Sequence, residues 1–147
     1  MQGMNNGIRI SPAAVADFHA AQRFYDACGY GGAAIQADDF VVLARHGNAI
    51  AGIGRLCNDA GFLCLRGMQV IATQRRYGIG SEILRLLSRQ IDADTCYCLP
   101  YSHLVDFYAR VGFELTRNPM PEVLEQRLHG YLNRGLNVTA MVRQARQ

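Results

Sequence analysis

The spacing of apolar positions changes near residue 80 of the 147-residue chain. Before that point, short alternating or continuous apolar runs bounded by turn residues predict β-strands. The predicted strands are Ile8 to Ile10, Phe40 to Arg45, Ala49 to Cys57 and Phe62 to Ala72. Residues 46–48 (HGN) predict a hairpin turn between the second and third of these strands.

One helix is predicted within this first part of the chain. Ser11 and Pro12 are typical of an N-cap followed by a first-turn proline, and Gly29 of a helix end. Four residues share one face at helical spacing: Val15, Phe18, Gln22 and Tyr25. A glycine-rich loop over residues 29–38 follows.

After residue 80 the pattern alternates between helices and strands. The predicted elements are a helix over Ile83–Ile91, a strand over Thr95–Leu99, a helix from Ser102 to Gly112, a strand over Phe113–Thr116, a helix from Pro121 to Gly135 and a strand over Val138–Val142. This order predicts an α+β fold with a mixed sheet, and the absence of repeats or linkers predicts one domain over residues 1–147.

The amino-acid composition excludes several classes of function. Half of the residues are apolar and 18% are charged, which predicts a soluble globular protein; no apolar run suits a membrane span or a secretory signal, so we expect a cytoplasmic location. All fifteen cations are arginine, which excludes a Walker-type phosphate loop and a lysine nucleophile. A net charge of +3 is too small to indicate nucleic-acid binding.

The cysteines and histidines do not indicate a metal site. Cys96 and Cys98 are expected on one face of a strand, but this spacing alone is no zinc signature. We interpret the five scattered cysteines as small buried apolar residues in a reducing compartment, and we expect no metal.

The sequence QRRYGIGSEILRLL, residues 74–87, predicts an anion site, because arginines and a Gly-x-Gly precede a helix. A Rossmann turn is disfavoured, since Ile83 stands at the third glycine position and the preceding strand belongs to a meander. The remaining design is an Arg-x-x-Gly-x-Gly turn that holds a pyrophosphate.

This turn resembles the acetyl-CoA motif of the GNAT superfamily of N-acetyltransferases. Residues 107–113 (FYARVGF) are similar to a second motif of that family, and residues 68–72 (MQVIA) stand where its fourth strand ends, with Ala72 replacing a usual proline. The resemblance covers residues 62–116 well and implies a GNAT-like, mostly antiparallel central sheet flanked by helices.

The resemblance also implies which residues bind acetyl-CoA. Backbone groups near Met68 and Val70 would hold the pantetheine arm, where a bulge splays the fourth strand from the fifth. The pyrophosphate would lie on the turn and the helix start, formed by Arg75, Arg76, Tyr77, Gly78, Ile79, Gly80 and Ser81.

The implied reaction is direct attack of an amine on the thioester in a ternary complex. Tyr108 corresponds to a tyrosine that faces the thiol, so we predict that it is the general acid; packing in the helix face is the alternative. No general base is assigned, because residues 62–68 contain no acid, and Glu114 could face either the cleft or the solvent. Tyr101 stands where the family often has an asparagine, so that carry-over fails.

The acceptor remains open: a small molecule, an amino-acid-like amine or a protein N-terminus, with an acyl group that is acetyl or longer. The loop at residues 29–38, the turn near Asn58 and the segment Thr116–Glu122 are expected to wall the acceptor site. Arg55 and Arg66 could bind a carboxylate there, although we favour the interpretation that they are exposed charges on strands.

The alternative function is a catalytically weak acyl-CoA-binding regulatory or sensing module. A homodimer is possible; no nucleic acid or membrane partner is expected.

Overall fold

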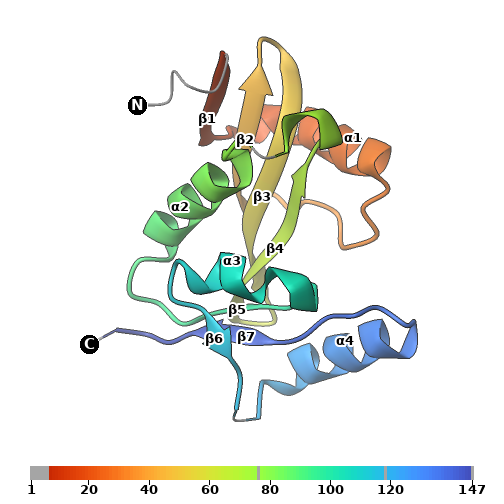
Figure 1. The fold of residues 1–147 in the computed structure, drawn as a ribbon, viewed down its shortest axis with the longest axis vertical. Helices are drawn as coiled ribbons and strands as arrows, with labels where there is room; N and C mark the ends of the chain where they lie inside the picture. Colours follow the sequence, from red (N-terminus) through yellow and green to blue (C-terminus); the bar gives the residue numbers. More distant parts are fainter. Residues whose placement is uncertain (1–6, 76, 118, 147) are drawn as a thin grey trace. The chain divides into compact units, whose positions relative to one another are not determined.

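The computed structural model describes residues 7–75, 77–117 and 119–146. Within these residues the chain forms a mixed seven-stranded sheet flanked by four α-helices, in the strand order β1-β2-β3-β4-β5-β7-β6 (Figure 1). The strands are β1 (Ile8–Pro12), β2 (Phe40–His46), β3 (Ala49–Asp59), β4 (Phe62–Val70), β5 (Cys96–Cys98), β6 (Glu114–Leu115) and β7 (Met141–Arg143). The α-helices are α1 (Phe18–Cys28), α2 (Ile79–Ile91), α3 (Val105–Ala109) and α4 (Glu122–Asn133). The predicted α+β class is confirmed.

The chain divides into two compact units, residues 1–57 with 65–90 and residues 58–64 with 91–147. The prediction of a single domain over residues 1–147 stays a prediction. Among the described residues, no helix combines the length and the apolar character that crossing a membrane requires.

In the first unit, the two faces of β3 carry different helices. Ile53 belongs to a buried cluster with Ala21 and Tyr25 of α1. On the other face, a Cβ on Gly54 would lie 2.9 Å from Ile83 Cγ2 and 3.0 Å from Leu87 Cδ1 of α2. A side chain at this position would therefore push α2 away from the strand. Figure 1 shows α1 in orange and α2 in green on either side of these strands.

Arg55 corrects the expectation of an exposed strand charge. It lies on the α1 face of β3 with 1% of its surface exposed. Its Nη1 donates to Asp39 Oδ2 at 2.8 Å, and Asp39 is itself 7% exposed. An unpaired charge at this depth would be very costly, so the ion pair is what allows the guanidinium to be buried.

Arg55 also fastens the glycine-rich loop between α1 and β2. Its guanidinium donates to the carbonyl oxygens of Ala33 and Ala34, and to the hydroxyl of Tyr30 at 3.4 Å. Gln22 of α1 accepts a hydrogen bond from the Ile35 N–H at 2.9 Å. The loop is thus held to both β3 and α1, and both terminal nitrogens of Arg55 are engaged inside the protein, while its Nε is buried without a partner among the described residues.

The first helix begins later than predicted. Ser11 and Pro12 belong to β1, where they pair with Leu43 and Val42 of β2. β1 is an edge strand, and a proline at the end of such a strand removes no bond inside the sheet. The chain then makes a short 3-10 turn, Val15–Asp17, so Val15 is 65% exposed instead of lying on the helix face.

Other predicted elements are present with different limits: β3 and α2 are longer than predicted, whereas β5, α3 and β6 are shorter. The hairpin at residues 46–48 and the helix ends at Gly29 and Gly135 are confirmed, both glycines having left-handed φ angles. Ser102 does not cap α3: it begins a 3-10 turn, Ser102–Leu104, and its Oγ lies 3.1 Å from Asn137 Oδ1. Ala72 belongs to a 3-10 turn, Ala72–Gln74, after β4 has ended.

In the second unit, a buried cluster lies under α4. Leu124 of α4 packs with Cys64, Met120 and Ala140, and Tyr97 of β5 packs against this cluster. Asp59, at the end of β3, forms an ion pair with Arg127 of α4. Both contacts place α4 against one side of this unit.

The burial of Arg55 predicts a large effect of removing its charge. Arg55→Met should lower the free energy of unfolding by about 3–5 kcal/mol, because Asp39 would stay buried without a counter-ion. Arg45→Met is the matched control, since Arg45 pairs with Asp17 at 3.1 Å while its side chain is 26% exposed. We expect the control to cost less than about 1 kcal/mol. Urea unfolding measures both, and equal effects would contradict the structural role of Arg55.

Candidate functional site

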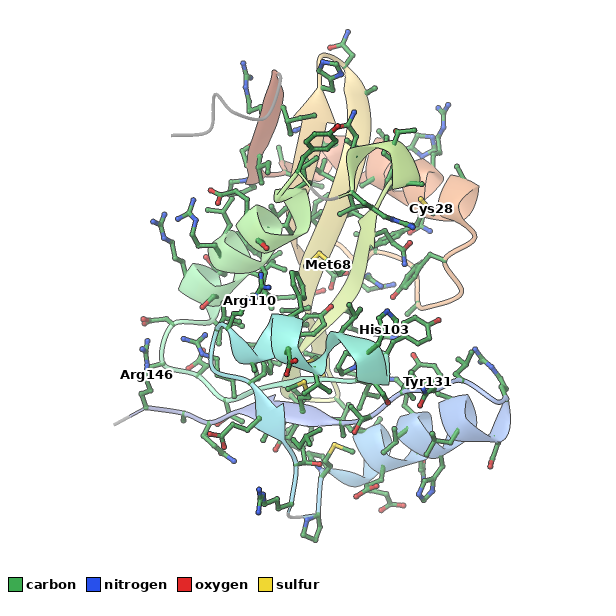
Figure 2. All side chains as sticks on the ribbon, viewed as in Figure 1. Cys28, Met68, His103, Arg110, Tyr131 and Arg146 are labelled. Carbon is green, nitrogen blue, oxygen red and sulfur yellow. The ribbon has the colours of Figure 1, made fainter. Side chains whose placement is uncertain are left out.

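The predicted pyrophosphate turn lies in the first unit, between the end of β4 and the start of α2 (Figure 1). Met68 and Val70 are partly buried on β4. Met68 Cε lies 3.3 Å from the point that a Cβ on Gly54 would occupy, on the side of the strands that α2 covers (Figure 2). The end of β4 and the first turns of α2 are therefore packed on the same face of the unit.

Arg75 is exposed and bends back toward β4. Its Nε donates to the carbonyl oxygen of Val70 at 3.0 Å. This bond brings a guanidinium to the end of the strand whose backbone is a predicted cofactor contact. Arg76, the second predicted arginine, lies outside the described residues.

Gly78 has a backbone conformation that favours glycine. Its φ angle is +78°, a left-handed value that residues with a Cβ rarely adopt. A Cβ built there would meet no atom within 4 Å, so the backbone borders open space. Tyr77 beside it is 52% exposed. Gly78 thus serves the turn itself, and it leaves room for a ligand to approach the main chain.

The start of α2 offers the N–H groups that an anion site needs. A backbone hydrogen bond joins the turn to the helix: the Glu82 N–H donates to the Gly78 carbonyl oxygen at 3.0 Å. The amides of Ile79 and Gly80 precede it, in the first turn, where an α-helix offers no carbonyl of its own. Ile79 is 1% exposed and anchors this turn to the core, whereas Ser81 is exposed.

The charges on α2 partly compensate one another. Glu82 forms an ion pair with Arg85, and the hydrogen bond from Arg85 lowers the pKa of the Glu82 carboxyl below its usual value. The first turn of α2 therefore carries one paired carboxylate, and Arg75 lies just before that turn.

Tyr108 lies in the second unit, on α3, with 5% of its surface exposed. Its ring makes edge contacts with Phe107 at 5.0 Å and Phe113 at 6.2 Å between centroids. Burial raises the pKa of Tyr108, and the nearby Cys98 raises it further. The hydroxyl is therefore a proton donor that stays protonated well beyond neutral pH, and its packing also fits the structural alternative.

Three further polar side chains, Glu114, Tyr101 and His103, are exposed in the second unit. Glu114 is exposed on β6 and lines a groove with Thr116 and Arg117. Tyr101 is 48% exposed, and its ring stacks on that of His103 with centroids 6.0 Å apart. His103 lies in the 3-10 turn before α3 and is labelled in Figure 2. Neither position identifies a general base.

The cysteines are consistent with the structural interpretation at most positions. Cys96 and Cys98 are buried on β5. Cys57 of β3 and Cys64 of β4 are also buried, whereas Cys28 is exposed. Burial raises the pKa of the Cys57 thiol to about 12. Within the described ranges, no three histidine, cysteine or acidic side chains gather as a metal site would require. The expected absence of a metal stays a prediction.

The resemblance implied a bulge in β4, but the sequence analysis assigned neither Gly67 nor its partner Tyr25 to it. Gly67 has a φ angle of +70° inside the strand, and its carbonyl oxygen accepts a hydrogen bond from the Tyr25 hydroxyl at 2.8 Å. A glycine within a strand pattern is a signal for a bulge, and that signal was available. The partner was not, because Tyr25 is 42 residues away in the sequence.

Comparisons with known proteins extend this picture. The model of the family described as "Acetyltransferase (GNAT) domain" matches residues 8–123. A search of curated proteins found no match.

Several solved structures share the fold. Rv2747 from Mycobacterium tuberculosis, solved in complex with CoA, is 19% identical, with a TM-score of 0.65 over 95% of this chain and 99% of that one. An acyl-CoA N-acyltransferase from Pseudomonas aeruginosa is 13% identical, with a TM-score of 0.68 over 92% and 99% of the two chains.

N-acetylglutamate synthase from Neisseria gonorrhoeae, complexed with coenzyme A and N-acetyl-glutamate, is 18% identical, with a TM-score of 0.64 over 95% of this chain. The match spans only 35% of that longer protein. At these identities the solved structures establish a common fold, while the family model covers most of the sequence. The chain therefore belongs to the GNAT acetyltransferase family.

Proposed function

We propose that this protein is an N-acetyltransferase that moves the acetyl group of acetyl-CoA to an amine. The observation that carries the proposal is the left-handed Gly78, which borders open space directly before the first turn of α2. A bare backbone at a helix N-terminus binds phosphate groups, and Arg75 adds positive charge beside it. Membership of the GNAT family supports acetyl-CoA as the phosphate-bearing ligand.

The proposed cofactor site follows the chain from β4 into α2. Backbone groups of Met68 and Val70 would bind the pantetheine arm, and the pyrophosphate would lie on the turn and first helical residues. The side chain of Arg75 is already tied to the Val70 oxygen, so one arginine would connect the two parts of the site. The contribution of Arg76 and Ser81 stays a prediction.

The reaction would need no covalent enzyme intermediate. The neutral amine nitrogen attacks the thioester carbonyl carbon, a tetrahedral intermediate forms, and the C–S bond breaks to release CoA thiolate. The nitrogen loses a proton to solvent or to a base, and Tyr108 would give its hydroxyl proton to the sulfur. Because burial raises the pKa of Tyr108, the tyrosine is a weak acid toward a thiolate, and its effect should be modest.

The acceptor class is open between an amino-acid-like amine, another small amine and a protein N-terminus. The shared fold with N-acetylglutamate synthase, which was solved with N-acetyl-glutamate, supports including amino acids among the amines tested. The match covers only 35% of that protein. An amine panel that includes amino acids, polyamines and peptides, with CoA release as the readout, tests the proposed activity. Tight acetyl-CoA binding without release for any amine would favour a regulatory or sensing module instead.

Substitution of Gly78 tests the cofactor site. Gly78→Glu should weaken acetyl-CoA binding at least about 100-fold, because it places a negative charge beside the pyrophosphate, and like-charge contacts cost several kcal/mol. Gly78→Ala is the control: it introduces the same strain of a left-handed φ, about 1–2 kcal/mol of stability, without the charge. Calorimetry gives both affinities. An unchanged affinity of the glutamate variant would remove the turn from the site.

Substitution of Tyr108 separates its two interpretations. Tyr108→Phe keeps the ring contacts and removes the hydroxyl, so kcat should fall on the order of 10- to 100-fold while acetyl-CoA affinity stays the same. The assay uses whichever amine the panel identifies. Turnover equal to that of the parent protein would leave Tyr108 as a packing residue only.

A further inference from the structure

The hydroxyl of Tyr25 forms a hydrogen bond with the backbone of a distant strand, β4. Tyr25 is completely buried on α1, and its hydroxyl donates to the Gly67 carbonyl oxygen at 2.8 Å. Burial raises the pKa of Tyr25 well above its usual range, although Arg55 acts in the opposite direction. The hydroxyl therefore remains protonated and keeps donating across the physiological pH range.

Gly67 is the point at which β4 departs from a regular strand. Its φ angle of +70° makes it the one left-handed residue within a strand in the part of the chain that the structure describes. A Cβ at this position would collide with the Tyr25 hydroxyl oxygen. Position 67 thus requires glycine for two reasons: its left-handed φ angle and the close approach of the Tyr25 hydroxyl.

The ring of Tyr25 is fixed from more than one side. It stacks on Tyr30 with ring centroids 4.3 Å apart, and the Arg55 guanidinium carbon lies 5.3 Å from its centroid. Arg55 is in turn held by its ion pair with Asp39 at 2.8 Å. Because these contacts fix the ring, they also fix the position of its hydroxyl, which donates to the Gly67 oxygen.

A left-handed residue within a strand changes the direction in which the backbone groups of the following residues point. Side chains alternate along a strand, and a shift of one residue reverses that alternation. Met68 follows Gly67 directly, and β4 continues to Val70; just beyond it, the Ile71 N–H donates to the Ala51 oxygen of β3 at 2.9 Å. The segment between these two points contains Met68 and Val70.

We propose that Tyr25 is a positioning residue for the cofactor, which fixes the Gly67 bend and thereby orients the backbone of Met68 to Val70 toward the pantetheine arm. This inference rests on the proposed function, which assigns the pantetheine arm to that backbone. Tyr25 acts through Gly67 and does not itself touch the cofactor. It connects α1 and the loop fastened by Arg55 to the strand that would hold the thioester.

The test compares two ligands and two variants by calorimetry. The ligands are CoA and adenosine 3′,5′-bisphosphate, which has the nucleotide end of CoA and lacks the pantetheine arm. Tyr25→Phe should weaken CoA binding about 3- to 10-fold, the range expected for loss of one hydrogen bond, and should change adenosine bisphosphate binding less than about 2-fold. Tyr30→Phe is the matched control, because its hydroxyl meets Arg55 and not Gly67.

The outcomes separate this proposal from the proposed function. Parent protein that binds neither ligand overturns the proposed function, and the role of Tyr25 with it. Parent protein that binds CoA, with Tyr25→Phe binding CoA equally well or losing both ligands equally, overturns the role of Tyr25 alone.

Hydrogen exchange gives a second readout that needs no ligand. In Tyr25→Phe, peptides that contain residues 67–70 should exchange faster than in the parent protein, while peptides from α2 should exchange at the same rate. Unchanged exchange at residues 67–70 would show that the bend persists without the hydroxyl, which overturns the proposal.

Discussion

The first unit depends on the buried ion pair between the Arg55 guanidinium and Asp39. A charge with 1% of its surface exposed must be paired and hydrogen-bonded, so the chain brings Asp39 and two loop carbonyls to it. The loop before β2 is fixed as a result. The same guanidinium lies over the rings of Tyr25 and Tyr30, so the position of α1 is tied to the same charge. Through the Tyr25 hydroxyl, this constraint reaches Gly67 in β4.

The opposite face of the same strands positions the proposed phosphate turn. Gly52 and Gly54 lack side chains where α2 approaches β3, and a Cβ on Gly52 would also lie 3.2 Å from the Gln69 oxygen. The close approach sets where α2 begins, and with it the position of Gly78. One face of the strands therefore shapes β4 through Tyr25, and the other positions the helix N-terminus. Both ends of the proposed cofactor site therefore depend on packing contacts that the cofactor would not touch.

The sequence predicted the features that depend on neighbours in the chain. Gly78 and its motif lie within a few residues of each other, so their spacing alone indicates a turn before a helix. Ser11 and Ser102 show the limit of that reasoning: both are good caps in isolation, but Ser11 pairs with β2 and Ser102 bonds to Asn137. The burial of Arg55 depends on Asp39, 16 residues away, and local pattern contains no measure of such a contact.

Thermal unfolding with and without acetyl-CoA tests the central claim most directly, with NADH and ATP as controls. Acetyl-CoA at about a hundred times its dissociation constant should add ~2.7 kcal/mol to stability. For a domain of this size the account predicts a rise in Tm on the order of 5 to 10 °C with acetyl-CoA and none with NADH or ATP. An unchanged Tm at saturating acetyl-CoA would contradict the proposed cofactor site and leave only the fold of the family.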